Sequence, residues 1–311
     1  MKTAIVTGAG GFIGRAVVKE LLDHNIRVAA VTKPGSPAGL PSSPLLTVLP
    51  LDLGNIRALA EARMAADVFY HLAWAGSAGQ ARADPALQLQ NVQWTLDCLH
   101  LAKETGCRRF ITAGSIMEHE AAAAAYTPGH RPGPGNIYGG GKLAAQIMSA
   151  SVAAGLGLDL VRAEITNAYG AGEKSPRFIN STIRKIMSGE ELLFTAGTQI
   201  YDFVYITDVA RAFHLIGRSG RPFCSYLIGS SRAKPLKDFL LEMKAAIAPD
   251  RDFIFGGLSY DGVSLPLEKF DCAMTERDTG FRAEIGFAEG VGLTRDWLAG
   301  ERRADDAKFQ L

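Results

Sequence analysis

The stretch VTGAGGFIGR, residues 6–15, lies between a short apolar run and a segment whose apolar side chains recur at helical spacing. The run Thr3–Thr7 has the length and composition of a buried β-strand, and residues 12–24 have the period of a helix. Glycines between them permit a tight turn, in which backbone N–H groups at the start of a helix can receive an anion. In a doubly wound α/β fold this turn holds the pyrophosphate of a dinucleotide. The G-x-x-G-x-x-G spacing from Gly8 to Gly14 therefore predicts a dinucleotide-binding domain.

Short apolar strands continue to alternate with helical segments as far as Arg162. This alternation is typical of a parallel sheet with helices on both faces. The predicted fold is an α/β, Rossmann-type doubly wound parallel sheet with a smaller C-terminal α/β lobe. Further strands are expected at 26–31, 46–49, 68–72, 110–113 and 158–162, and helices at about 55–64, 86–105, 137–154, 176–188 and 208–216.

Beyond Arg162 the alternation loosens into glycine-rich turns and short extended pieces, which indicates a second lobe. We expect a dinucleotide-binding domain at 1–165 and a substrate lobe at 166–300, with a soft boundary. The tail 301–311 carries many charges and few apolar anchors, so disorder is expected there. The segment 121–136, five alanines followed by a Pro/Gly stretch, is interpreted as a surface excursion.

Charge and composition exclude several classes of function. The chain has 33 Lys and Arg against 32 Asp and Glu, so no global field attracts nucleic acid or an anionic membrane. No apolar run approaches the ~18 residues of a membrane helix, and the first residues resemble a strand and glycine turn rather than a secretory signal. A soluble cytoplasmic protein is expected. The four cysteines and six histidines show no ligand spacing, so we expect reduced thiols, no disulfides and no metal site.

Taken together, the motifs resemble those of the extended short-chain dehydrogenase/reductases, in the group of nucleotide-sugar epimerases, dehydratases and reductases. The resemblance covers nearly the whole chain. Besides the glycine turn it rests on LDL at 51–53, HLA at 71–73, NV at 91–92, AGS at 113–115 and Y-x-x-x-K at 138–142.

The resemblance implies a role for each motif. The Asp of LDL would lie against the adenine ring, HLA would end the fourth strand beside the cofactor, and NV would open a long helix. AGS would end the fifth strand with a catalytic hydroxyl at Ser115. The expected cofactor contacts are Gly8, Gly11, Phe12, Ile13, Gly14, Thr32, Lys33, Asp52, Leu53, Leu72, Ala73, Tyr138 and Lys142.

The pentapeptide YGGGK, residues 138–142, places three glycines in a helical pattern, at a cost of roughly 3 kcal/mol relative to alanine. A spacing of four puts Tyr138 and Lys142 on one helix face. The Lys142 ammonium would favour the phenolate of Tyr138, which could then exchange a proton with a sugar hydroxyl or ketone, and Lys142 would also hold the nicotinamide ribose. Ser115 would donate a hydrogen bond to the same oxygen. The glycines would let the backbone pass close to cofactor and substrate; a flexible loop, with Tyr138 a core aromatic, is the alternative.

The two residues after Ser115 help to distinguish between the reactions of this family. Dehydratases of this group carry an Asp-Glu pair there, whereas this chain has Ile116 and Met117. Neither side chain can act as acid or base, so dehydration is not expected.

The second lobe resembles a sugar-nucleotide site. NAYG at 167–170 matches the family's Asn-x-Tyr-Gly turn, and QIYDFVYITDVARA at 199–212 resembles its Q-x-R-D block. Tyr201 replaces the diphosphate-binding Arg of most relatives, which leaves the positive charge to another residue, and the later R-x-G-D element is absent. The expected substrate contacts are Asn167, Arg177, Gln199 and Tyr201, with Arg184 and Arg277 as further candidates for the missing charge.

The coenzyme is predicted from the end of the strand at 26–31. A carboxylate there normally accepts the ribose hydroxyls of NAD, but no Asp or Glu occurs between His24 and Leu51. Thr32 and Lys33, with help from Arg15, could instead bind a 2′-phosphate, so NADP is expected and NAD remains possible.

The preferred function is reduction of a 4-keto sugar nucleotide. An NAD-dependent nucleotide-sugar 4-epimerase is the alternative. A non-catalytic dinucleotide-binding regulator and a reductase of other ketones, such as steroids or aldehydes, are minor ones. The expected partners are a nucleotide sugar and a second copy of the chain in a homodimer, with neither nucleic acid nor membrane.

Overall fold

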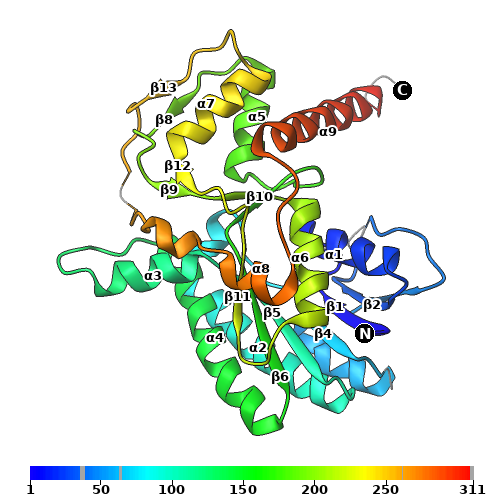
Figure 1. Ribbon diagram of the computed structural model, residues 1–311. Helices are drawn as coiled ribbons and strands as arrows, with labels where there is room; N and C mark the ends of the chain where they lie inside the picture. Colours follow the sequence, from blue (N-terminus) through cyan, green and yellow to red (C-terminus); the bar gives the residue numbers. More distant parts are fainter. Residues whose placement is uncertain (36–38, 63–64, 261, 309–311) are drawn as a thin grey trace. The chain divides into compact units, whose positions relative to one another are not determined.

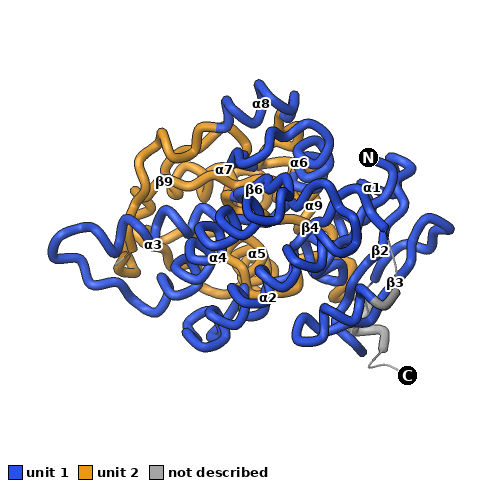
Figure 2. Tube along the Cα trace, turned by 90° about the horizontal axis from the view of Figure 1, so that it is seen from below, with its two compact units in different colours: residues 1–165, 209–228, 272–281 blue, residues 166–208, 229–271, 282–311 orange. Residues whose placement is uncertain are grey.

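The computed structural model describes residues 1–35, 39–62, 65–260 and 262–308. Contacts divide the chain into two compact units, coloured separately in Figure 2. Unit 1 comprises residues 1–165, 209–228 and 272–281, and unit 2 comprises 166–208, 229–271 and 282–311. Unit 1 thus contains two late segments that the sequence-based boundary assigned to the substrate lobe.

Unit 1 is built on a seven-stranded sheet in the order β11-β6-β5-β4-β1-β2-β3, and all its strand pairs are parallel (Figure 1). This confirms the predicted Rossmann-type doubly wound fold. The last strand, β11, was not predicted, because it follows β6 by some 60 residues of unit 2 and α6. The strands are β1 (Thr3–Thr7), β2 (Arg27–Thr32), β3 (Leu46–Pro50), β4 (Val68–His71), β5 (Arg109–Ser115), β6 (Asp159–Ile165) and β11 (Ser225–Ile228).

Helices cover both faces of this sheet. Successive side chains of a strand point to opposite faces. Phe69 joins the buried apolar cluster formed with α2, α4 and η1, whereas its neighbour Tyr70 contacts Gly217 of α6. The helices are α1 (Phe12–Asp23), η1 (Leu53–Ala62), η2 (Gln80–Ala83), α2 (Pro85–Glu104), α3 (Met117–Tyr126), α4 (Gly135–Leu156), α6 (Ile206–Ser219) and α8 (Ala273–Thr279).

The alanine run at 121–125 corrects one expectation. It forms half of α3 rather than a surface excursion, because Ala121 and Ala124 are buried and α3 packs against α4. The Pro/Gly stretch after it, residues 127–134, is the mostly exposed connection to α4.

Unit 2 consists of short strand pairs and three longer helices around an aromatic core. The rings of Tyr169, Phe203, Phe239 and Phe287 contact one another at centroid distances between 4.8 and 6.2 Å. The elements are β7 (Asn167–Tyr169), α5 (Phe178–Ser188), β8 (Leu193–Phe194), β9 (Ile200–Tyr201), β10 (Phe203–Tyr205), β12 (Lys234–Pro235), α7 (Leu236–Ile247), β13 (Ile254–Phe255), η3 (Leu267–Phe270) and α9 (Phe287–Lys308).

Three further expectations from the sequence concern the C-terminal tail, the cysteines and the apolar character of the helices. The tail expected to be disordered continues α9 as far as Lys308, and residues 309–311 lie outside the described residues. All four cysteines are free thiols, three of them buried and Cys224 half-buried. Within the described parts of the chain, none of the helices has the length and hydropathy needed to cross a bilayer.

Candidate active site

The glycine turn between β1 and α1 is sterically closed to side chains. Gly8 has φ +69°, and a Cβ atom on it would lie 2.7 Å from the Cα atom of Ala73. A Cβ atom on Gly14 would lie 2.0 Å from the carbonyl oxygen of Gly8, so α1 can approach the turn only without one. Gly11 is the N-cap of α1 and supplies no side-chain cap, and the first turn of α1 contains no acidic residue. Uncapped amides at a helix start without negative charge fit the pyrophosphate of a dinucleotide.

A buried chain of hydrogen bonds connects this turn to β4 and α2. The hydroxyl of Thr95 donates to the carbonyl of Asn91, so it accepts from Nε2 of His71 at 3.1 Å. Nδ1 of His71 then accepts from the hydroxyl of Thr7 at 2.9 Å, and that hydroxyl accepts from the amide of Ala73. The network thereby assigns the His71 proton to Nε2. It orders the end of β4 beside the glycine turn.

The His71 ring is kept neutral by its surroundings. Burial, with a smaller contribution from the charge of Lys142, lowers the pKa of His71 to about 3. Protonating the ring would also remove the acceptor that Thr7 uses, so the hydrogen-bond chain requires the neutral form.

Ser115, the predicted catalytic hydroxyl, ends β5. Its Oγ accepts from the amide of Met117 at 3.3 Å, which leaves the hydroxyl proton to be donated to another oxygen. Its own amide donates to Oε1 of Glu118 at 2.8 Å. Burial raises the pKa of Glu118, and the guanidinium of Arg162, which pairs with it, opposes that shift. Arg162 also contacts Glu164, so a buried ionic cluster supports the end of β5.

Tyr138 and Lys142 both lie on the first turns of α4 and are both buried. Nζ of Lys142 donates to the carbonyl of Ala113 at 2.9 Å and lies 3.8 Å from the centroid of the Trp74 ring. The Trp74 ring in turn meets the Tyr138 ring edge-on at 6.2 Å. The guanidinium of Arg82 lies 4.6 Å from the Tyr138 centroid. The predicted pair therefore shares one aromatic and cationic cluster at the end of β5.

Burial is the main influence on the charge of Lys142. It lowers the pKa of Lys142, the carboxylate of Glu118 opposes this shift, and Arg162 adds to it. The Ala113 carbonyl and the Trp74 ring face are both contacts that favour the ammonium form.

The three glycines between Tyr138 and Lys142 have different surroundings. A Cβ atom on Gly139 would lie 2.2 Å from the carbonyl oxygen of Met117 in α3, and one on Gly141 would lie 3.0 Å from Cβ of Gln88 in α2. Around Gly140 no heavy atom of the described chain lies within 4 Å of such a Cβ. The glycines were expected to admit cofactor and substrate. The contacts around two of them are instead helix packing, with α3 at Gly139 and α2 at Gly141.

The remaining predicted cofactor residues lie around the sheet's carboxyl edge. Phe12 and Ile13 form the half-buried start of α1, and Leu72 and Ala73 follow β4. Asp52 and Leu53 follow β3, where Oδ1 of Asp52 accepts from the amide of Gly54. These positions remain predictions as cofactor contacts.

The end of β2 and the start of α2 also bear on the predicted motifs. Thr32 is buried at the end of β2, and Lys33 next to it is exposed. Asn91 was expected to open a helix, but α2 begins at Pro85 with Asp84 as its N-cap. The Asn91 side chain instead exchanges hydrogen bonds with the backbone of Ala75.

The predicted substrate residues lie in unit 2. The amide of Asn167 donates to the carbonyl of Asp202 at 3.1 Å, and Gln199 is buried and donates to Thr195. Tyr201 stacks on Phe203 at 5.6 Å, so this aromatic residue extends the core of unit 2.

Three arginines are candidates for the missing positive charge, two in unit 2 and one in unit 1. Arg177 pairs with the carboxylate of Glu173 at 3.0 Å, and Arg184 donates to the carbonyl of the same residue. Arg277 lies in unit 1, where it pairs with Asp278. The structure therefore brings Arg177 and Arg184 together around Glu173.

Sequence reasoning missed four residues that surround the predicted catalytic group: Trp74, Arg82, Gln88 and Glu118. Gln88 accepts from the Trp74 indole at 2.7 Å and donates to the carbonyls of Gly76 and Ala81, so it orders the loop after β4. Trp74 directly follows HLA, and Glu118 follows Ser115 by three residues. Their closeness to these motifs in the sequence could have identified both as residues of the site. Arg82 reaches Tyr138 only through tertiary structure.

Fold and site together define a dinucleotide-dependent enzyme of the Rossmann class. The model of the NAD dependent epimerase/dehydratase family matches residues 4–229. A dTDP-6-deoxy-L-talose 4-dehydrogenase (NAD(+)) from Aggregatibacter actinomycetemcomitans is 31% identical over 278 residues, which cover 84% of this chain and 97% of that protein. A dTDP-glucose 4,6-dehydratase from Streptomyces antibioticus is 23% identical over 96% of this chain and 92% of its own length.

A solved structure extends the similarity to the three-dimensional level. MoeE5 in complex with UDP-glucuronic acid and NAD superposes with a TM-score of 0.79 at 27% identity, covering 97% of this chain and all of that one. The chain belongs to the NAD-dependent epimerase/dehydratase family and is an extended short-chain dehydrogenase/reductase enzyme.

Proposed function

We propose that this enzyme reduces the C4 ketone of a nucleotide-activated 4-keto sugar. The observation that carries the proposal is the cluster at the end of β5. Ser115 ends this strand, and Lys142, which shares α4 with Tyr138, donates to the carbonyl of Ala113 two residues before Ser115. The dehydrogenase relative, whose name specifies oxidation at C4, supports the choice of reaction, because reduction is its reverse.

In this mechanism the bound coenzyme supplies a hydride to C4 of the sugar. Tyr138 gives its phenolic proton to the C4 oxygen, so ketone and hydride together become a secondary alcohol. Ser115 donates a hydrogen bond to the same oxygen, and Lys142 stabilises the phenolate that remains. Arg82, over the face of the Tyr138 ring, adds positive charge near that phenolate.

Dehydration is disfavoured by the residues after Ser115. Ile116 is buried and Met117 carries a thioether, so neither exchanges protons. Glu118, the next acidic residue, is engaged by the Ser115 amide and by Arg162. These contacts assign Glu118 a supporting role, in which it positions Ser115.

The coenzyme is proposed to be NADPH. Lys33 is exposed directly after β2, where a 2′-phosphate would lie, and no carboxylate is present between residues 25 and 51 to bind the ribose hydroxyls of NADH. The name of the dehydrogenase relative specifies NAD(+), and the MoeE5 complex contains NAD, so the ratio of the affinities for NADPH and NADH is the quantity to measure.

Unit 2 is proposed to bind the nucleotide sugar. Asn167, Gln199 and Tyr201 would line this site, and Arg177, which shares Glu173 with Arg184, would supply the charge for the diphosphate. Arg277, which pairs with Asp278 in unit 1, stays a further candidate for this charge.

A homodimer is also proposed. The helices α2 and α4 pack against each other and carry three exposed large apolar side chains, Leu89, Ile147 and Met148. Apolar side chains on adjacent helices are typical of surfaces that associate.

A nucleotide-sugar 4-epimerase is the second candidate, favoured by the family description. The two functions differ in coenzyme balance, because an epimerase returns its hydride and a reductase consumes it.

The test is incubation of purified protein with a panel of 4-keto and 4-hydroxy nucleotide sugars and either coenzyme. The reductase consumes one reduced coenzyme per product, and deuterium from labelled coenzyme appears at C4. Interconversion of 4-hydroxy sugars without added coenzyme would establish the epimerase instead. Absence of both reactions across the panel, with coenzyme bound, would reject the nucleotide-sugar assignment.

A further inference from the structure

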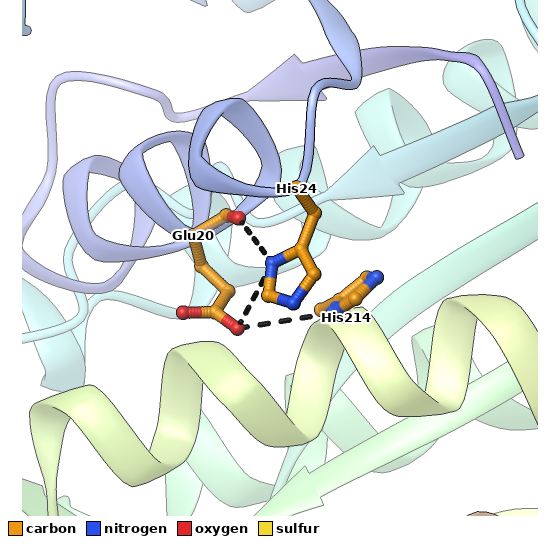
Figure 3. A group of neighbouring side chains, drawn as sticks. All are labelled: Glu20, His24 and His214. Atoms are coloured by element: carbon orange, nitrogen blue, oxygen red, sulfur yellow. Dashed lines mark hydrogen bonds and ion pairs between the residues drawn. The ribbon is translucent and has the colours of Figure 1, made fainter.

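Three potential metal ligands gather at the end of α1, away from the residues of the proposed reaction. Glu20 and His24 are four residues apart on α1, so they lie on the same helix face. His214 comes from α6, in a different segment of unit 1. Figure 3 shows the three side chains turned toward one another. The six histidines showed no ligand spacing in the sequence, because the fold brings two of them together across 190 residues.

The geometry of the group is compact. One ligand atom from each of the three residues lies within 4.8 Å of the others. Oε1 of Glu20 is 3.5 Å from Nδ1 of His24 and 3.7 Å from Nδ1 of His214. The two imidazole rings have centroids only 3.9 Å apart. Two imidazoles and one carboxylate are therefore close neighbours.

Hydrogen bonding prepares one of the imidazoles for coordination. Nδ1 of His24 lies 2.9 Å from the backbone carbonyl oxygen of Glu20. A carbonyl can only accept, so Nδ1 carries the proton and Nε2, which keeps its lone pair, is the ligand atom of His24. The 3.5 Å between Nδ1 and Oε1 of Glu20 is therefore a contact of the N–H group with the carboxylate and not a distance between two ligand atoms. A backbone carbonyl on the far nitrogen is the usual support of a metal-bound histidine.

The group is mostly buried but is open to solvent at one of its three side chains. The His214 side chain is 7% exposed and that of Glu20 19%, whereas His24 is 48% exposed and leaves one side open to water. His24 is also the C-cap of α1, where the helix dipole favours a cation. The adjacent acid, Asp23, is engaged by Lys19 and is not part of the group.

We propose that Glu20, His24 and His214 bind a divalent transition-metal ion such as Zn²⁺. Two imidazoles and a carboxylate, with a water in the fourth position, form a donor set that suits zinc and its neighbours and does not suit Mg²⁺ or Ca²⁺. The ion would join the end of α1 to α6. Because none of the three residues belongs to the proposed reaction, the ion would stabilise unit 1 and would take no part in proton transfer.

The test uses the full chain without an affinity tag, freed of metal with a chelator. Zn²⁺ is titrated in competition with a chromophoric chelator, and Co²⁺ is added separately to record its absorption spectrum. We expect one Zn²⁺ per chain, a Co²⁺ spectrum typical of nitrogen and oxygen ligands, and a rise in the melting temperature with Zn²⁺ but not with Mg²⁺.

His24→Ala is the decisive variant, because His24 is exposed and its loss should leave the fold intact. It should weaken Zn²⁺ binding at least tenfold and remove the rise in melting temperature, and Glu20→Gln should do the same. His100→Ala, an exposed histidine on α2, is the matched control and should bind as the wild type does. Cys224→Ser should also leave binding unchanged, because the half-buried thiol is not a ligand. The proposal is overturned if His24→Ala binds Zn²⁺ as tightly as the wild type, or if the wild type binds none at millimolar Zn²⁺.

Discussion

Gly139 in α4 lies directly against the carbonyl oxygen of Met117 in α3, at a separation that leaves no room for a Cβ atom. Gly141, two residues on, meets Gln88 of α2. The proposed catalytic residues Tyr138 and Lys142 flank these glycines, so their backbone positions are set by close contacts with two other helices.

The glycines give the first prediction. Gly139→Ala should destabilise the protein by about 3 kcal/mol or more, because the new methyl group meets backbone that cannot move away cheaply. Gly140→Ala should instead stabilise it by about 0.5–1 kcal/mol, since alanine is the better helix former and its Cβ meets no neighbour. The measurement is urea unfolding followed by circular dichroism.

Gly140→Ala also serves as the matched control, being the same substitution one residue away. Equal effects of the two substitutions would show that the contact with Met117 does not exclude a side chain at position 139.

The second prediction concerns the proton donor. Tyr138→Phe should lower the turnover rate by roughly 10²- to 10⁴-fold, because it removes the acid and little packing. Coenzyme affinity should stay within a few fold, measured by fluorescence titration. A variant that kept more than about a tenth of the wild-type rate would show that Tyr138 is not the acid.

Lys142→Ala should reduce both turnover and coenzyme affinity, since one side chain serves the phenol and the ribose. Its buried contacts with Ala113 and Trp74 make a check of folding by circular dichroism necessary. Loss of turnover with unchanged coenzyme affinity would separate the two proposed roles.

The third prediction rests on the lowered pKa of His71. The unfolded ring titrates near 6.5 and the folded ring near 3, so the unfolded state binds more protons between these values. The contribution of His71 is therefore fully present above about pH 6.5. It is lost as the pH falls, by roughly 1.4 kcal/mol per pH unit. Unfolding free energies in urea at pH 6.5 and 5 measure this slope.

His71→Asn should reduce the slope over this interval by the same amount, even though the variant is less stable at every pH. His100→Asn, at an exposed position on α2, should keep the wild-type slope. If the slope of His71→Asn equalled that of the wild type, the ring would not be held neutral in the folded protein.

The fourth prediction tests the coenzyme. Lys33→Asp should weaken NADPH binding by roughly 10- to 100-fold, as expected for the loss of a charge-assisted contact of about 1.5–3 kcal/mol. It should leave NADH binding unchanged or improve it. Lys103→Asp, an exposed lysine on α2, provides the same charge change away from β2. Equal losses for NADPH in both variants would assign the effect to net charge rather than to a phosphate site.

The fifth prediction concerns the proposed dimer. Ile147→Glu places a charge among the exposed apolar side chains of α2 and α4 and should convert a dimer to a monomer in analytical ultracentrifugation. Leu241→Glu makes the same kind of change on α7, at a side chain that is 45% exposed, and should leave the association state unchanged. A wild type that sediments as a monomer at micromolar concentration would reject the dimer.

Local sequence pattern predicted the first half of the chain well. The strand Thr3–Thr7 was placed residue for residue, and those that became β2 to β6 were placed with the correct order. The reason is physical, because a buried parallel strand needs a short apolar run and the glycine turn has few alternatives. The motif Y-x-x-x-K also identified the helix, although it could not indicate why the glycines are there.

Long-range contacts were beyond the reach of such patterns. The pairing of β11 with β6 joins residues some 60 apart in the chain, and the four residues of β11 have no distinctive pattern. The alanine run of α3 favours a helix but has little amphipathic signal, so the sequence pattern did not indicate that this segment packs against α4. The group formed by Glu20, His24 and His214 is likewise created only by the fold.

The late strand β11 also limits how this protein can be cut or recombined. Expression of residues 1–165 alone would leave β6 as an edge strand, with the backbone groups that pair with Ser225 to Ile228 exposed. An uncovered edge of a mostly apolar parallel sheet invites association with other chains, so such a fragment should aggregate. Exchange of substrate units between relatives therefore has to transplant three separate segments, 166–208, 229–271 and 282–311, rather than one terminal block.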